Sequence, residues 1–318
     1  MVGQVIVLYI WKTDMVQNKR GRIRSALLLV VLSLFLFLYN WIAQSLPLSH
    51  IKPKVEQADI SLLVEKDKHS DAELQFLSTQ TGLHPQSIQD QLNQGRRQGL
   101  LQIQQQYFAP IWVKALKTTP LTVSEAIVDE QGNICYGMPL VDIRDGDILL
   151  TKNSRFWGWR NGHAALVVEA EKGLMLEAVM PGTNSRISPI SKWSTYPSFL
   201  VLRLKDEYRK GTADKEIDLP KQIADYASKE LTDIPYLLVA GILERSLPER
   251  MTTVKAAGQN AEQTTIKEKA LKGTHCAHLV WYAYKQFGID LDSDGGLIVT
   301  PYDIQNSEYL DIIQTYGY

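Results

Sequence analysis

The sequence predicts an α+β fold in which an antiparallel sheet packs on one amphipathic helix, preceded by an apolar N-terminal segment. The helix is indicated by residues 273–290, where apolar residues recur with the spacing of a buried helical face. The sheet is indicated by two short apolar runs, Ile148–Leu150 and His163–Glu169, each of which follows a turn signal. The N-terminal segment is indicated by the uncharged run Ser25–Ile42.

Residues 1–24 and 25–46 are predicted to be a cytoplasmic segment and a transmembrane signal anchor. The uncharged run Ser25–Ile42 would form a helix about 27 Å long, just enough to cross a bilayer. A basic cluster precedes this run, so we expect the N-terminus in the cytoplasm and the rest in the periplasm or at the cell surface. Two alternatives stay open: Met15 as the true start, and cleavage near Ala43 to give a secreted form.

Residues 47–130 are predicted to be a polar, largely helical region. Within it, residues 72–93 have the outline of a helix-turn-helix, with Gly82 at the turn and Pro85 opening the second helix. DNA binding needs a basic recognition helix, but this one is rich in glutamine, and the chain has a net charge of only −1. We therefore expect no nucleic-acid partner and favour a spacer or a subdomain that gates substrate access.

Residues 131–318 are predicted to contain a cysteine nucleophile and its base. Cys276 follows Thr274, a suitable N-cap, and would lie in the first helical turn, where free backbone N–H groups stabilise a thiolate. His163 opens a strand and is expected to be exposed enough to titrate, so it can take a proton from a thiol. The alternatives are a buried structural cysteine and a structural histidine.

The chain has two cysteines, Cys135 and Cys276, which excludes a disulfide framework and a cysteine-rich zinc site. No metal and no cofactor is expected. A disulfide between the two would consume the nucleophile, so we expect Cys135 to be a spare thiol.

Several motifs resemble the papain-like cysteine hydrolases of the NlpC type, in their circularly permuted, YiiX/YaeF-like form. The segments Ile234–Tyr236 and His275–Leu291 are similar to the family's Pro-Tyr motif and its cysteine helix, and Thr300–Ile304 is similar to the end of the permuted domain. The histidine strand precedes the cysteine helix here, as in the permuted branch. The resemblance covers roughly residues 139–318 and implies a permuted papain-like domain.

The chain departs from the family pattern around the cysteine. His275 and Ala277 replace the family's aspartate and serine, His278 replaces its glycine, and residues 237–240 replace a glycine-rich run. These differences concern substrate preference more than chemistry. The extra polar stretch Glu244–Lys272 is predicted to be a surface insertion or a lid.

The resemblance implies roles for three residues: Cys276 attacks, His163 acts as base and then acid, and Glu177 orients His163. A hairpin turning near residues 171–173 could place Glu177 on the face of His163, and a bulge would spoil that arrangement. The alternatives are that Glu169 is the orienting residue, or that Glu177 forms only a surface salt bridge.

Four residues are expected to contact substrate: Tyr236, Trp157, Trp159 and His278. Trp157 and Trp159, which lie just before His163, could instead pack down on the domain.

We expect a membrane-anchored, extracytoplasmic cysteine hydrolase of peptidase or amidase type that cleaves an amide or related acyl bond in cell-wall peptides. One alternative is a hydrolase or acyltransferase of the same fold that acts on acyl lipids. Another is a catalytically silent module that binds the cell envelope.

Overall fold

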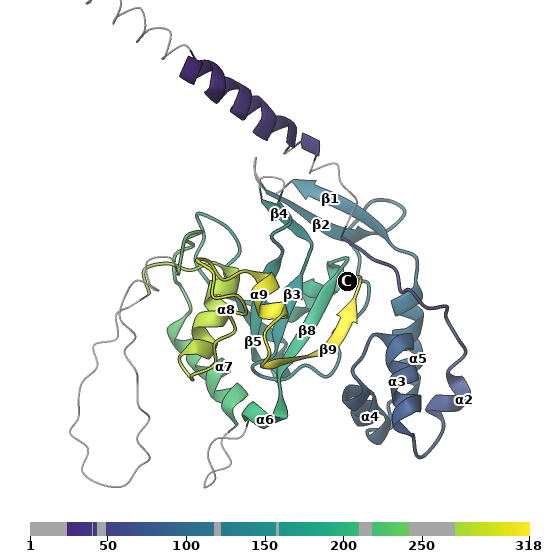
Figure 1. The fold of residues 1–318 in the computed structure, drawn as a ribbon. Helices are drawn as coiled ribbons and strands as arrows, with labels where there is room; N and C mark the ends of the chain where they lie inside the picture. The colour runs from purple at the N-terminus through teal and green to yellow at the C-terminus, as the bar shows by residue number, and fades with distance from the viewer. Residues whose placement is uncertain are drawn as a thin grey trace, which may run out of the picture.

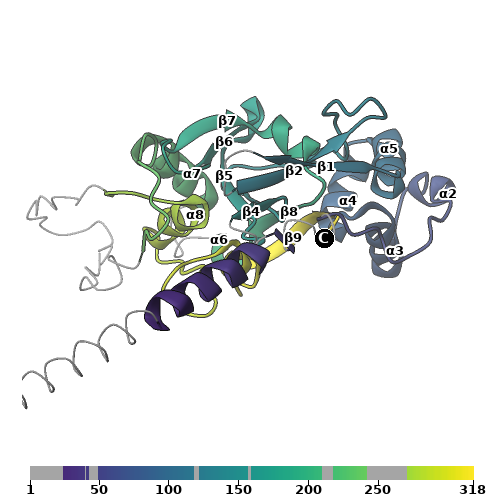
Figure 2. The same ribbon diagram turned by 90° about the horizontal axis from the view of Figure 1, so that it is seen from above.

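The computed structural model confirms an α+β architecture built on two antiparallel sheets (Figure 1). Helices cover both faces of the larger sheet, as the view from above also shows (Figure 2). The structure describes residues 24–39, 41–42, 49–117, 122–156, 159–209, 218–241 and 271–318.

The larger sheet has six strands in the order β7-β6-β5-β3-β8-β9, and all neighbouring pairs are antiparallel. The predicted strands at Ile148–Leu150 and His163–Glu169 are confirmed as β3 and β5. Their unbroken apolar runs are explained by burial on both faces. The strands are β3 (Ile148–Thr151), β5 (His163–Glu169), β6 (Leu174–Glu177), β7 (Arg186–Pro189), β8 (Phe199–Leu204) and β9 (Leu310–Tyr316).

Two helices, α7 (Leu219–Glu230) and α8 (Cys276–Lys285), pack on one face of this sheet. Leu279 and Val280 of α8 share a core with Leu166 of β5. The predicted amphipathic helix is therefore confirmed, and its apolar face fixes the Cys276 end of α8 against the start of β5.

Four helices pack on the opposite face, where Leu77 and Ile88 share a core with Val167 of β5. The helix-turn-helix outline is confirmed: Gly82, at φ 70°, ends α3 and Pro85 begins α4. This region is thus part of the main body rather than a separate spacer. The helices are α2 (Ser61–Val64), α3 (Asp71–Thr81), α4 (Pro85–Asn93) and α5 (Arg97–Phe108).

The predicted helical character of residues 47–130 stops at Phe108. After it, the chain forms a three-stranded sheet in the order β1-β2-β4, and β2 contains the β-branched residues Thr122, Val123, Ile127 and Val128, which favour a strand. Ser124 of β2 pairs with Ser154 of β4. Strand β2, which belongs to residues 47–130, therefore lies close to the start of β5. The strands are β1 (Trp112–Lys117), β2 (Thr122–Val128) and β4 (Ser154–Phe156).

Four short elements complete the described fold. The 3-10 helix η1 links β5 to β6, and η2 follows β7. They are η1 (Ala170–Lys172), η2 (Ile190–Thr195), α6 (Asp206–Arg209) and α9 (Pro301–Gln305).

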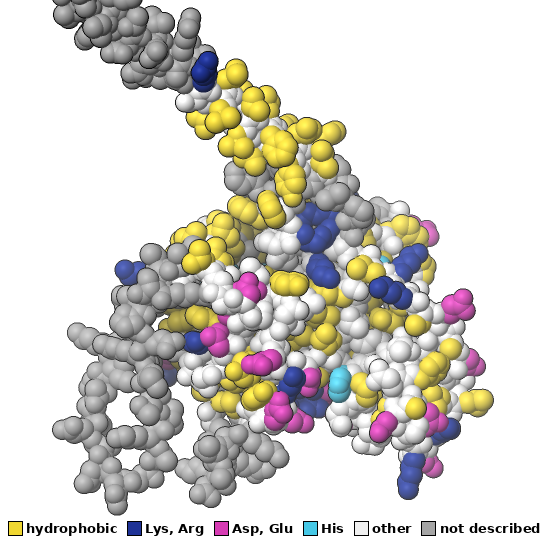
Figure 3. All heavy atoms as spheres, viewed as in Figure 1, with side chains coloured by type: hydrophobic (Ala, Val, Ile, Leu, Met, Phe, Trp, Pro, Cys, Tyr) yellow, Lys and Arg dark blue, Asp and Glu magenta, His cyan; other side chains and the backbone are white. Residues whose placement is uncertain are grey.

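Residues 24–39 form a helix that projects from the body with its apolar side chains on the surface (Figures 1 and 3). Within the described ranges, no helix has both the length and the apolar character needed to cross a bilayer. The predicted anchor extends over residues 40 and 43–46, which lie outside those ranges, as do residues 1–23.

Candidate active site

His163 is held at the start of β5 by the glycine before it. Gly162 adopts φ +67°, and a Cβ there would lie 2.5 Å from the carbonyl oxygen of Thr151. Its own carbonyl accepts a hydrogen bond from Ser154 Oγ at 2.6 Å. Only glycine fits such a turn without strain, so the turn sets the position of the imidazole. His163 is 8% exposed, so the expected solvent exposure is wrong.

Cys276 is the first residue of α8, as predicted, but the N-cap is His275 rather than Thr274. The ring Nδ1 of His275 accepts the backbone N–H of His278 at 3.4 Å. Thr274 is fully buried, and its hydroxyl lies 3.1 Å from Nδ1 of His278 instead. The imidazole of His275 therefore caps the helix directly beside the thiol.

Glu177, the predicted orienting residue, contacts His163: its Oε2 lies 3.0 Å from His163 Nε2. The β5–β6 hairpin turns at Gly173, as predicted, but it contains a bulge between Val167 and Glu169. The prediction that a bulge would separate Glu177 from His163 is wrong, because the shifted register brings the two side chains together.

The register explains this result. Glu169 pairs with Leu174 next to the turn, and that register, continued unbroken, would set Glu177 opposite Leu166 on the α8 face. Beyond the bulge, Leu166 pairs with Leu176, so Glu177 lies opposite Ala165. Residues two apart on a strand share a face, so Glu177 and His163 become diagonal neighbours.

The three groups shift one another's pKa. Burial raises the pKa of Cys276, but hydrogen bonds and charge from His163 and His275 outweigh it and bring that pKa to about 5. Burial lowers the pKa of His163, but Cys276 and Glu177 raise it to about 9. Burial also opposes ionisation of Glu177, yet His163 and Lys192 lower its pKa to about 2. Between about pH 5 and pH 9 the site is therefore a thiolate–imidazolium pair beside a carboxylate.

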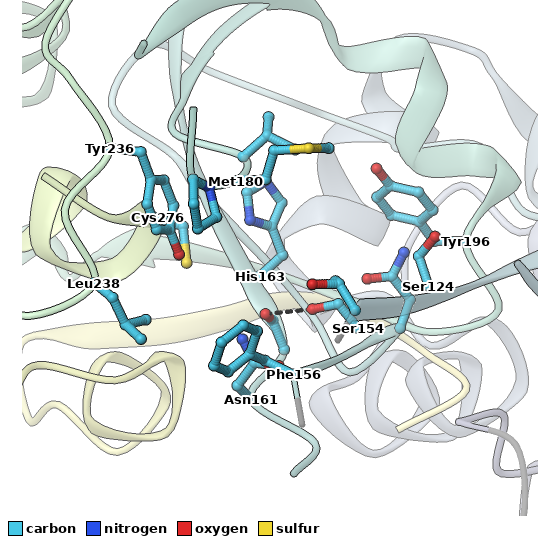
Figure 4. Close-up of a pocket in the computed structure, with 15 residues that line it drawn as sticks. Ser124, Ser154, Phe156, Asn161, His163, Met180, Tyr196, Tyr236, Leu238 and Cys276 are labelled. Carbon is cyan, nitrogen blue, oxygen red and sulfur yellow. Dashed lines mark hydrogen bonds between the residues drawn. The ribbon is translucent and has the colours of Figure 1, made fainter. Parts of the chain in front are cut away.

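A pocket opens onto this pair (Figure 4). Cys276, Tyr236 and Leu238 lie at one end and the hydroxyl-bearing Ser124, Ser154 and Tyr196 at the other, with His163 between them. Lys, Arg, Asp and Glu do not occur among the described residues that line it. The further lining residues are Thr122, Asn153, Phe156, Asn161, Gly162, Val179, Met180 and Pro181.

The four residues expected to contact substrate have different positions. Tyr236 lines the pocket beside Cys276, where burial and the thiolate charge raise the pKa of its phenol. Trp159 is 67% exposed and does not line the pocket; its ring lies near that of Tyr39, with centroids 5.8 Å apart and planes tilted by 47°. Trp157 lies outside the described residues.

His278 is fully buried, at 0% exposed, so it does not reach substrate in this arrangement. Its ring packs under Gly241, where an added Cβ would lie 3.1 Å from the imidazole. The expectation of a substrate contact is wrong because residues 237–241 fold over this side of α8.

Two contributors to the site were missed from the sequence. His275 carried a signal, because it is adjacent to the nucleophile. Lys192 carried none: its Nζ donates to Glu177 Oε1, but Lys192 is fifteen positions further along the chain, beyond strand β7. The predicted insertion Glu244–Lys272 lies almost wholly outside the described residues.

Both cysteines are free thiols. Elsewhere in the described ranges, Asp292, Asp294 and Asp303 bring three carboxylates within 4.8 Å of one another. Asp303 forms the capping box of α9 with Thr300, which accounts for its position structurally.

Comparison of the chain with models of known protein families, with curated proteins and with solved structures found no match.

Proposed function

We propose that this protein is a cysteine hydrolase that cleaves an amide or related acyl bond. The observation that carries the proposal is the meeting of Cys276, His163 and Glu177, which come from three different elements. Glu177 contacts His163 at 3.0 Å, and the pKa of Cys276 is lowered to about 5 by its imidazole neighbours. A merely structural cysteine has no need of a stabilised thiolate.

Since His163 Nε2 is directed to Glu177, Nδ1 is the nitrogen that exchanges protons at the reaction centre. The Cys276 thiolate attacks the carbonyl carbon, and the charge that develops on oxygen is stabilised by the Cys276 backbone N–H, free at the helix start. His163 gives its proton to the leaving amine or alkoxide, which departs and leaves a thioester. His163 then takes a proton from the attacking water, and the acid product and thiolate are released.

We further propose a permuted papain-like fold of the NlpC type. Its support is the order of elements, with the β5–β6 hairpin first and the cysteine helix α8 last, together with the motif resemblance. By that resemblance, the proposed substrates are cell-wall peptides.

The location is proposed from the sequence: a single-pass anchor at Ser25–Ile42 with the hydrolase outside the cytoplasm. Such an enzyme would act within reach of both the cell wall and the membrane surface.

A second candidate, an acyl-lipid hydrolase or acyltransferase, is favoured by the lining of the pocket. Phe156, Val179, Met180 and Leu238 supply apolar walls, and the described lining residues include no Lys or Arg that could pair with the carboxylates of a wall peptide. Such walls suit an uncharged acyl group.

The experiment is an assay of full-length protein in membranes against peptidoglycan peptides and acyl-lipid esters. Cys276→Ser and His163→Ala should each abolish product release, because one lacks the nucleophile and the other the proton carrier. Release of peptide supports the first candidate, and release of fatty acid supports the second. An envelope ligand that is bound but never cleaved would instead indicate a binding module, and activity in the soluble fraction would contradict the anchor.

A further inference from the structure

Both carboxylate oxygens of Glu177 have partners in a fully buried position, at 0% exposed. Oε2 contacts His163, and Oε1 accepts a hydrogen bond from Lys192 Nζ. The Lys192 side chain is 31% exposed, so it reaches inward from the surface. Glu177 therefore lies between an imidazole on one side and an ammonium group on the other.

The segment that carries Lys192 is fixed on several sides. Ile190 N–H donates to the carbonyl of Gly173 at 2.8 Å, and Gly137 N–H donates to the carbonyl of Ser194 at 2.7 Å. The next residue, Trp193, is fully buried and stacks on the imidazole of His163, with ring centroids 5.9 Å apart and planes at 23°. Two consecutive residues of η2, Lys192 and Trp193, thus contact Glu177 and His163 respectively.

We propose that Lys192 is a positioning residue that acts through Glu177: it holds Oε1 so that Oε2 faces His163. The inference rests on the proposed function, since it assigns a fourth member to the same site. An unpaired acceptor in a buried position is costly, so without Lys192 the carboxylate would rotate or take up a proton.

The charged and titratable groups around the site determine in which direction the pKa values move when Lys192 is lost. Glu177 faces His163, Lys192 and the phenol of Tyr196, and His163 faces Cys276 and Glu177. Cys276 faces His163 and His275. It also faces Tyr236, because the charge of Cys276 raises the pKa of the Tyr236 phenol.

Loss of Lys192 removes a positive charge beside Glu177, so Glu177 takes up a proton at higher pH than in the wild type. A Glu177 carboxylate that has rotated away from His163, or has taken up a proton, supports the imidazolium less, and the thiolate is then lost at higher pH too.

The test is alkylation of Cys276 by iodoacetamide across pH 4 to 9, in full-length protein carrying Cys135→Ser. We expect Lys192→Met to move the acid midpoint of alkylation upward by about 1 pH unit. Turnover should fall about 10-fold in kcat with little change in KM, as expected for a group that acts on the catalytic base. Lys192→Arg should restore both, because it keeps the donor and the charge.

Lys192→Gln keeps a donor without the charge and separates position from electrostatics. It should keep most of kcat but still show the shifted midpoint. The matched control is Lys172→Met, which removes a surface ion pair with Glu169. It should change neither quantity.

The double variant Lys192→Met with Glu177→Gln decides whether Lys192 acts through Glu177. We expect Lys192→Met to have no further effect once Glu177 is changed, whereas equal effects in both backgrounds would overturn the inference. If wild-type Cys276 reacts like an ordinary thiol, the proposed function itself fails. If wild-type behaviour is as proposed and Lys192→Met is silent, only the role of Lys192 fails.

Discussion

At the scale of single residues, the chemistry of the site depends on two opposed pKa shifts. The pKa of Cys276 falls to about 5, so its thiolate is present above that pH, and the pKa of His163 rises to about 9, so its imidazolium is present below it. The ion pair is therefore lost in acid through Cys276 and in base through His163. Activity that depends on the pair should give a bell-shaped pH profile.

Glu177→Gln tests the orienting residue. The amide keeps the size of the side chain but removes the charge that supports the imidazolium, so kcat/KM should fall roughly 10- to 1000-fold. The pKa of His163, measured by NMR of the ring protons, should fall as well. Full activity together with an unchanged His163 pKa would show that Glu177 does not orient His163.

At the scale of elements, the sequence predicted what depends on local pattern. The period of residues 273–290 predicted α8, and turn signals predicted β3, β5 and the hairpin after it. The sequence did not predict the bulge in β5, because a bulge depends on how both faces of the sheet pack and not on any local residue type. The buried position of His278 was missed because the residues that cover it, 237–241, are distant from it along the chain.

Gly162→Ala tests the turn that positions His163. The added Cβ meets backbone at Thr151 in a left-handed conformation, so we expect a loss of more than about 1 kcal/mol in the free energy of unfolding. Turnover should fall because the imidazole moves with the turn.

The matched control is Gly173→Ala, which has φ +65° but nothing within 4 Å of its added Cβ. It should cost only the backbone strain and leave turnover nearly unchanged. The free energy of unfolding is measured by urea denaturation. An equal loss of this free energy and equal turnover in the two variants would contradict a positioning role for the Gly162 turn.

At the scale of the whole molecule, the site is assembled from distant segments. Residues of β2 and β4 line one part of the pocket, and Tyr236, Leu238 and Cys276 line another. Helices α2–α5 cover the face of the larger sheet that lies opposite α8. These pairings could not be predicted, because long-range strand pairing leaves little local signal. The pairing of Cys276 with His163 was predicted only as a candidate, from residue types at the start of a helix and of a strand.

The most direct test of the central claim is the rate of alkylation of the two cysteines as a function of pH. Burial and the charge of Asp129 raise the pKa of Cys135, so near pH 7 it should be largely a thiol. Cys276 should react at least about 10-fold faster there, with a midpoint near pH 5, and His163→Ala should remove the difference. An ordinary thiol has a pKa of about 8.5. If the midpoint for Cys276 lies there and His163→Ala does not change it, both the pairing of the thiolate with His163 and the proposed hydrolase function are contradicted.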